Sequence, residues 1–256
     1  MAVPTGAEEL GAEELGAEQV SAEQVGAERA GPLAALVLAG GRARRLGGAD
    51  KPGIAIGGRA MVAAVAAAAA GAGAGHVVVV GPPRPGLAGE LAARGCAVAF
   101  TSEQPPGAGP VPALRAGLQL IAAPWLILLA ADLPFLQDSH LRALLTAATG
   151  QQASGAMLVD DQGRPQWLAS CWRAADLAAA LAGYQGSSLG GVLGPLRPVE
   201  VTVAPDRAPP WLDCDTPEDV AAARALSRGP DHQQGTDHQQ GTDDPQRREA
   251  DDEHTR

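Results

Sequence analysis

The sequence predicts an α/β protein built on a single doubly wound, mostly parallel β-sheet. Short, continuously apolar segments rich in Val, Ile and Leu alternate with longer segments of helical character, and glycines follow the first apolar segment directly. In a sheet of this kind, ligands bind beyond the carboxyl ends of the strands. Polar residues that follow the apolar segments are therefore the first candidates for a functional site.

Seven apolar segments have the length and composition of strands: 34–39, 76–80, 97–100, 125–130, 156–159, 167–172 and 199–203. Five segments favour helices: 59–72, 111–121, 139–148, 174–181 and 217–226. The last has the clearest start, because Thr216 is a good N-cap, Pro217 suits the first helical position, and Glu218 and Asp219 place acids in the first turn.

The two ends of the chain differ from its middle. Residues 1–30 contain five tandem pentads such as GAEEL, and residues 229–256 repeat DHQQGT before an acidic run. Both segments are polar and of low complexity, so we expect disordered termini around one domain at 31–228. The net charge of −10 resides in these ends, since residues 31–228 carry 14 acidic and 15 basic residues. This balance does not favour a nucleic-acid partner.

The cysteines and the N-terminus indicate the compartment. Cys96, Cys171 and Cys214 are far apart and none belongs to a CxxC pair, which argues against a zinc ribbon and a disulfide framework. The N-terminus lacks the pattern of a signal peptide, and no apolar run reaches the roughly 20 residues of a membrane span. We therefore expect a cytoplasmic protein without a membrane partner.

The first predicted strand runs into the glycine-rich sequence GGRARRLGGADK at 40–51. Glycines after a strand let backbone N–H groups approach phosphate oxygens, and Arg42, Arg44, Arg45 and Lys51 add four cations. The spacing matches neither the P-loop nor the dinucleotide-binding glycine motif. Lys51 is the single Lys among 19 basic residues, which suggests a requirement for a compact ammonium group, although chance survival is an equal alternative.

Two further acidic positions are candidates for binding a metal. Asp132 follows the buried strand 125–130, and a carboxylate there suits Mg²⁺, although a turn cap before Pro134 is the alternative. Asp213 and Asp215 precede the last helix. Because side chains alternate along an extended segment, we expect only one of them to face a site. We favour Asp215, while a role limited to the helix entry is equally open.

These residues resemble the nucleotidyltransferase signature L-A-G-G-x-x-x-R-M-G-x-D-K in its molybdenum cofactor guanylyltransferase form, with Leu46 in place of Met. The resemblance spans roughly 33–227 and implies the Rossmann-like nucleotidyltransferase fold of the MobA-like NTP transferase family. It further implies catalytic roles for Arg45, Lys51 and Asp132. The residues it implies for nucleotide and metal binding are Leu38, Ala39, Gly40, Gly41, Lys51, Glu103, Asp132 and Asp215.

Two loops resemble the family less closely. The segment 103–111 is similar to the family's acidic loop before G-P-L, and an acid suits a guanine edge because that edge carries two donors. Glu103 is the candidate, while an ungapped placement selects Ser102. Pro112 departs from the family and puts the start of the next helix in question. The segment 159–167 resembles the acceptor-side hairpin, with a solvated turn equally open.

The resemblance implies transfer of GMP from GTP to the phosphate of a molybdopterin-type acceptor, with Mg²⁺ as cofactor and pyrophosphate as product. Transient contact with enzymes that make or receive the cofactor is a further expectation. The alternatives are a transferase that uses CTP or a different phosphorylated acceptor, a non-catalytic nucleotide-binding regulator, and an interaction protein whose function lies in its repeats.

Overall fold

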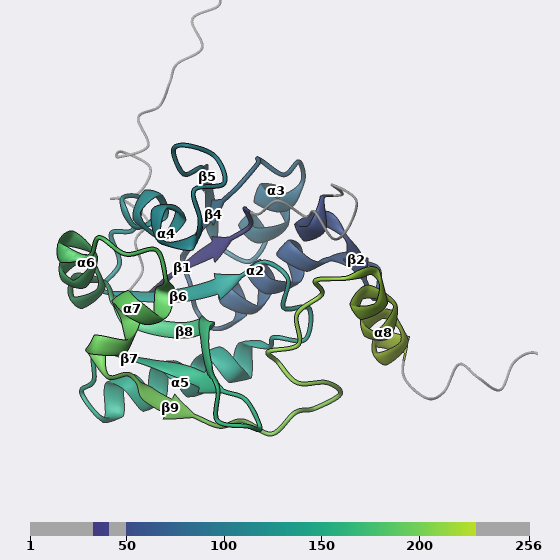
Figure 1. Cartoon of the computed structure of the whole chain (residues 1–256). Coiled ribbons are helices and arrows are strands. Elements are labelled where there is room, and N and C mark those ends of the chain that lie inside the picture. The colour runs from purple at the N-terminus through teal and green to yellow at the C-terminus, as the bar shows by residue number, and fades with distance from the viewer. Residues whose placement is uncertain (1–32, 41–49, 229–256) are drawn as a thin grey trace, which may run out of the picture.

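The computed structural model describes residues 33–40 and 50–228 (Figure 1). A seven-stranded sheet has the order β5-β4-β1-β6-β8-β7-β9. Its strands are β1 (Leu33–Leu38), β4 (His76–Val80), β5 (Ala97–Thr101), β6 (Trp125–Ala130), β7 (Gly155–Val159), β8 (Pro165–Arg173) and β9 (Val199–Val201). A small antiparallel pair joins β2 (Ala55–Ile56) to β3 (Arg59–Ala60). All seven predicted strands are present in the large sheet.

The pairing confirms a doubly wound, mostly parallel sheet. Strands β5, β4, β1 and β6 run parallel to one another, β8 is antiparallel to both β6 and β7, and β9 is parallel to β7. The chain builds outward from β1 through β4 to β5 and then returns to place β6 on the other side of β1. This reversal between β1 and β6 is the position where sheets of this type bind ligands.

Seven α-helices are described: α2 (Met61–Gly71), α3 (Leu87–Ala92), α4 (Pro110–Leu118), α5 (Asp138–Gly150), α6 (Ala174–Gly183), α7 (Leu189–Leu193) and α8 (Pro217–Arg228). Single 3₁₀ turns form η2 (Lys51–Gly53) and η3 (Gly194–Leu196). The five predicted helices are among them. The short helices α3 and α7 were not predicted, because each contains glycine and is too short to show a helical period.

Three predicted helix starts differ from the structure by one or two residues, and α5 begins one residue early, at Asp138. The helix predicted from Arg59 begins at Met61, because Arg59 and Ala60 pair with β2 as strand β3. Helix α4 begins at Pro110 and includes Pro112 in its first turn. A proline costs little there, since the first N–H groups of a helix have no partner within the helix.

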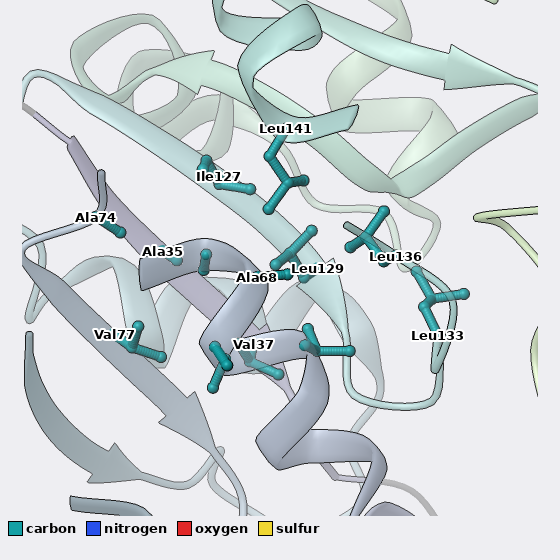
Figure 2. Packing of buried hydrophobic residues seen from close by; sticks show 14 of the residues in the cluster. Ala35, Val37, Ala68, Ala74, Val77, Ile127, Leu129, Leu133, Leu136 and Leu141 are labelled. Carbon is teal, nitrogen blue, oxygen red and sulfur yellow. The ribbon is translucent and has the colours of Figure 1, made fainter. Parts of the chain in front are cut away.

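Helices cover both faces of the sheet, and side-chain alternation along the strands divides the core. On one face, Ala35, Val37, Ile127 and Leu129 belong to a cluster with residues of α2 and α5 (Figure 2). On the other face, Leu36, Leu38 and Leu128 pack with residues of α4, α6 and α7. Helix α8 packs separately against the β2–β3 pair (Figure 1).

The parallel strands end at one edge, and backbone hydrogen bonds hold the chain together just beyond it. Ala39 N donates to Val80 O at 2.9 Å, and Ala131 N donates to Leu38 O at 3.1 Å. The segments that follow β1, β4 and β6 therefore leave the sheet side by side. The predictions for Gly41, Arg45 and the two termini lie outside the described residues, and the domain limits at 31 and 228 stay a prediction.

We expect Gly117→Ala to lower the free energy of unfolding by about 1–3 kcal/mol. A Cβ at Gly117 in α4 would collide with the side chain of Leu36 and lie 2.8 Å from Val80 Cγ2, so the helix would have to move off the sheet. Denaturant titration of the purified variants measures the effect.

Gly89→Ala in α3 is the matched control. No atom lies within 4 Å of a Cβ at Gly89 outside its own helix and chain neighbours, so alanine should stabilise the helix by up to about 1 kcal/mol. Equal stability of the two variants would contradict close packing of α4 on the sheet.

Candidate functional site

Three charged side chains from distant parts of the chain meet at the carboxyl edge of the sheet. Lys51 begins η2, Asp132 lies two residues beyond β6, and Asp215 lies two residues before α8. The ammonium group of Lys51 donates hydrogen bonds to the carboxylates of both Asp132 and Asp215. The side chains of Lys51 and Asp132 are 16% and 20% exposed, against 48% for Asp215. The ion pair to Asp132 is therefore the better protected from solvent screening.

The carboxylates keep the lysine charged despite its burial. Burial acts to lower the pKa of Lys51, but the hydrogen bonds and negative charges of Asp132 and Asp215 outweigh it, so the pKa lies above its usual value. Lys51 is thus an ammonium ion throughout the neutral range, and it balances part of a local excess of negative charge.

Asp213 is the third carboxyl group in this region. Burial raises its pKa, and the negative charges of Asp215 and Asp132 raise it further. Asp213 lines a pocket together with Asp132, while Asp215 contacts Lys51. The segment 212–215 is irregular rather than a strand, and the choice of Asp215 over Asp213 for a metal stays a prediction.

One pocket at this edge, called the main pocket here, has a volume of about 730 Å³. It lies beyond the ends of β1, β4 and β5. Its lining includes Ala39, Gly40, Asp50, Lys51, Pro82, Pro83, Ser102, Glu103 and Gly107. Both sequence candidates for base recognition, Glu103 and Ser102, therefore face the same space.

Glu103 is buried at the rim of the main pocket. Its Oε1 accepts a hydrogen bond from Gly107 N at 2.9 Å, which fixes the loop after β5. A Cβ at Gly40 would lie 3.5 Å from the same oxygen. The carboxylate of Glu103 therefore lies directly beside the end of β1.

Two smaller pockets continue the main pocket across the sheet edge. A middle pocket of about 370 Å³ shares Gly40, Glu103 and Gly107 with the main pocket and is also lined by Asp132. A third pocket of about 280 Å³, called the Trp pocket here, also contains Asp132. Its lining includes Ala130, Leu133, Gln166, Trp167, Leu168, Leu189, Trp211 and Asp213. Asp132 thus lines two neighbouring pockets.

The β7–β8 hairpin supplies part of the Trp pocket. Asp160 is buried and accepts hydrogen bonds from Gln162 N at 2.9 Å, Arg164 N at 2.8 Å and Gln166 Nε2 at 3.3 Å. Burial acts to raise the pKa of Asp160, but the hydrogen bonds from Arg164 and Gln162 lower it overall. These hydrogen bonds are sufficient to explain the turn as a structural feature. They also fix Gln166 near the start of β8, beside Trp167.

Most of the residues implied by the sequence lie around these pockets. Leu38, Ala39, Gly40, Lys51, Glu103 and Asp132 line at least one of them, and Asp215 contacts Lys51. Gln166 lies in the segment 159–167 that resembles the acceptor-side hairpin, whereas Trp211 was not a candidate for the site. Tryptophan directly before the acidic segment 213–219 was the available signal, since this chain contains four Trp in all.

None of the histidines and cysteines among the described residues lines these pockets. Burial lowers the pKa of His76 and of His140, and His140 Nδ1 accepts from Gln137 N at 3.1 Å. Burial raises the pKa of Cys171 to about 12 and that of Cys214 to about 11. The arrangement can neutralise and orient anions, and it suits a nucleophile that is already ionised.

Residues 33–40 and 50–228 contain no group of three or more His, Cys, Asp or Glu side chains placed to hold a metal ion. A metal at Asp132 would therefore take most of its ligands from bound phosphate and water, as Mg²⁺ commonly does. The same residues contain no helix that is long and apolar enough to cross a membrane.

Solved structures share this fold. Molybdopterin-guanine dinucleotide biosynthesis protein A from Archaeoglobus fulgidus aligns with a TM-score of 0.56 at 20% identity, over 76% of this chain and 98% of that one. The 2-C-methyl-D-erythritol 4-phosphate cytidylyltransferase from Thermus thermophilus aligns with a TM-score of 0.53 at 18% identity, over 77% and 98%. At these identities the likeness concerns the fold alone.

Sequence comparison goes further. Molybdenum cofactor guanylyltransferase from Bradyrhizobium sp. (strain ORS 278) is 31% identical over 75% of this chain and 92% of its own length. The enzyme of the same name from Rhodobacter capsulatus is 30% identical over 75% and 94%. The model of the MobA-like NTP transferase domain matches residues 35–199. The chain therefore belongs to the MobA-like NTP transferase family and is a nucleotidyltransferase.

Proposed function

We propose that this protein transfers GMP from GTP to the phosphate of a molybdopterin-type acceptor in the cytoplasm and releases pyrophosphate. The observation that carries the proposal is a row of three adjoining pockets in which Lys51 lines the first, Asp132 lines the other two, and an ion pair joins the two side chains. One side can take a nucleoside triphosphate and the other side a second phosphorylated molecule. The names of the curated relatives support the choice of substrates.

The main pocket would bind GTP. Glu103 can accept hydrogen bonds from the N1–H and amino group of guanine, both of which are donors, whereas adenine presents an unprotonated N1 at that edge. Lys51 and Pro52 line the side of the pocket nearer Asp132, so the triphosphate would point toward the Lys51 ammonium. Gly41 and Arg45, which precede this segment, are assigned to phosphate binding by the family resemblance alone.

Asp132 and Asp215 fit an Mg²⁺ ion that accompanies the triphosphate. Their carboxylates already converge on one cation, the Lys51 ammonium, and carboxylate oxygens are the protein ligands that Mg²⁺ prefers. Asp213 lies on the acceptor side and is the alternative to Asp215. When bound, Mg²⁺ supplies charge neutralisation and an ordered geometry for the phosphates.

The Trp pocket would bind the acceptor. Trp167 packs over Gly190, where a Cβ would lie 3.3 Å from the indole Nε1, and Trp211 packs against the core on the other face of the sheet. Two anchored indoles that border one pocket favour a flat heterocycle such as a pterin. Gln166 and Asp213 add oxygen acceptors for the N–H groups of such a ring.

The chain's contribution to the reaction is orientation and charge neutralisation. An oxygen of the acceptor phosphate forms a bond to the α-phosphorus while the bond to the bridging α–β oxygen breaks, and that oxygen leaves on pyrophosphate. A phosphate is already ionised at neutral pH, so its attack requires no side chain to remove a proton. Lys51 would balance the charge that develops on the phosphates.

A transferase specific for CTP is the main competing proposal, because a cytidylyltransferase shares the fold. Affinities for GTP, CTP, ATP and UTP with Mg²⁺ distinguish the two. Pyrophosphate release with a molybdopterin acceptor separates an enzyme from a nucleotide-binding regulator. Tightest binding of CTP, or absence of release with every acceptor, would overturn the proposed activity.

We expect Glu103→Gln to weaken GTP binding by about tenfold or more and to leave the weaker ATP affinity nearly unchanged, because only guanine loses charge-assisted hydrogen bonds. The glutamine amide would still offer an oxygen to Gly107 N, so the loop should keep its shape. Calorimetric titration with each nucleotide checks this. Ser102→Ala is the control, and a GTP-selective loss there instead would transfer base recognition to Ser102.

We expect Asp132→Ala to abolish turnover and Asp132→Asn to reduce it by about 100-fold or more, with the fold intact in both. The carboxylate contributes little to folding, because a partly buried charge has a desolvation cost that its partner only offsets. Pyrophosphate release across a range of Mg²⁺ concentrations measures the effect. Asp176→Asn in α6 is the control. Wild-type activity of Asp132→Ala at saturating Mg²⁺ would rule out the metal assignment.

We expect Lys51→Arg to lower turnover by about tenfold, which corresponds to about 1.4 kcal/mol of transition-state stabilisation. The wider, planar guanidinium cannot take the place of the compact ammonium between Asp132 and Asp215. Lys51→Ala should be worse. Arg59→Lys, which alters an ion pair with Glu90 away from the main pocket, should stay within about twofold of wild type. Equal turnover of Lys51→Arg and wild type would mean that charge alone suffices.

A further inference from the structure

A second ion pair joins two walls of the main pocket. Arg84, in the loop between β4 and α3, donates from Nη2 to Asp50 Oδ1 at 2.6 Å and from Nη1 to Asp50 Oδ2. This is a two-pronged guanidinium–carboxylate pair, which fixes orientation as well as distance. Asp50 directly precedes Lys51, and Pro82 and Pro83, which directly precede Arg84, line the same pocket.

The arginine side of the pair is rigidly held. Arg84 lies in the sequence GPPRPG at 81–86, where Pro83 and Pro85 restrict the backbone on both sides. Its side chain is 14% exposed, and its Nε is buried without a hydrogen-bond partner among the described residues. An unsatisfied buried donor has a cost in stability. The guanidinium thus uses Nη1 and Nη2 to bind Asp50, while its Nε makes no hydrogen bond within the described residues.

Asp50, the other partner of the pair, holds the backbone next to Lys51. Asp50 O accepts from Gly53 N at 3.0 Å and Lys51 O accepts from Ile54 N at 3.0 Å, so the pair anchors the first residue of the η2 turn. A Cβ at Gly53 would collide with the Asp50 carboxylate and lie 3.1 Å from Arg84 Nη1. The hydrogen bond from Arg84 lowers the pKa of Asp50, which keeps its carboxylate charged at neutral pH.

We propose that Arg84 is a positioning residue that acts through Asp50 to hold the Lys51 ammonium at Asp132. The lysine side chain has four rotatable bonds, so its ammonium reaches the two carboxylates reproducibly only if its Cα is fixed. Arg84 itself touches neither Lys51 nor Asp132 by any hydrogen bond found in the structure of residues 33–40 and 50–228. Its effect on turnover rests on the proposed function and would pass through Lys51.

A double-mutant cycle tests the route of this effect. Arg84→Gln should lower the rate of pyrophosphate release by about tenfold in the wild-type background but by less than about twofold in Lys51→Ala, measured in single turnovers with excess enzyme. Arg84→Lys keeps the charge without the two-pronged geometry and should fall between Arg84→Gln and wild type. Asp50→Asn combined with Arg84→Gln should be no worse than either change alone. Equal losses in both lysine backgrounds would overturn the proposal.

Amide exchange provides a readout that needs no substrate. Arg84→Gln should accelerate hydrogen–deuterium exchange at the amides of Gly53 and Ile54 by about tenfold, whereas Arg59→Gln, the matched surface control, should leave both unchanged. Unchanged exchange in Arg84→Gln would overturn the positioning role even if wild-type protein proved inactive. Fast exchange in a protein that releases no pyrophosphate would instead reject the proposed function and retain the Arg84–Asp50 constraint on Lys51.

Discussion

The contact of one ammonium group with two carboxylates organises the functional edge of this protein. Lys51 reaches Asp132 and Asp215 from a turn that follows β1, while its partners follow β6 and precede α8. Like charges this close would repel each other if the cation were absent, and the partial burial of Lys51 and Asp132 strengthens both attraction and repulsion. The Lys51 ammonium therefore offsets the repulsion between the two carboxylates that meet at this edge.

The sheet provides the fixed frame that this contact requires. Strands β1 and β6 are buried on both faces by two separate clusters, and they pair in parallel along six residues. The carboxyl ends of these strands are therefore fixed relative to each other. The two pockets that contain Asp132 are lined partly by residues at these ends, so the positions of those lining residues are fixed as well. The Arg84–Asp50 pair extends the same constraint to the turn that carries Lys51, where no strand of the large sheet reaches.

The sequence predicted much of this fold because the strong signals in it are local. Continuous apolar segments such as 125–130 identify buried strands, and the start of α8 follows from its capping residues. The convergence of Lys51, Asp132 and Asp215 was implied by resemblance alone, since their spacing of 81 and 164 residues has no local signature. Trp211 and Arg84 were missed for a related reason, because their roles depend on which loops the sheet order brings together.

The chemistry of the site follows from its charges. Asp132, Asp213 and Asp215 lie near a single ammonium group, that of Lys51, so negative charge is in excess there. The pKa of Asp213 is raised first by burial and further by the charges of Asp215 and Asp132. A triphosphate would add to that excess, so productive binding at Asp132 requires additional positive charge to arrive with it. Under the proposed function, a metal–nucleotide complex would supply that charge, and Lys51 would then interact with the phosphates instead of the carboxylates. The ion pairs of Lys51 with Asp132 and Asp215 would in that case belong to the nucleotide-free protein and give way when the nucleotide binds.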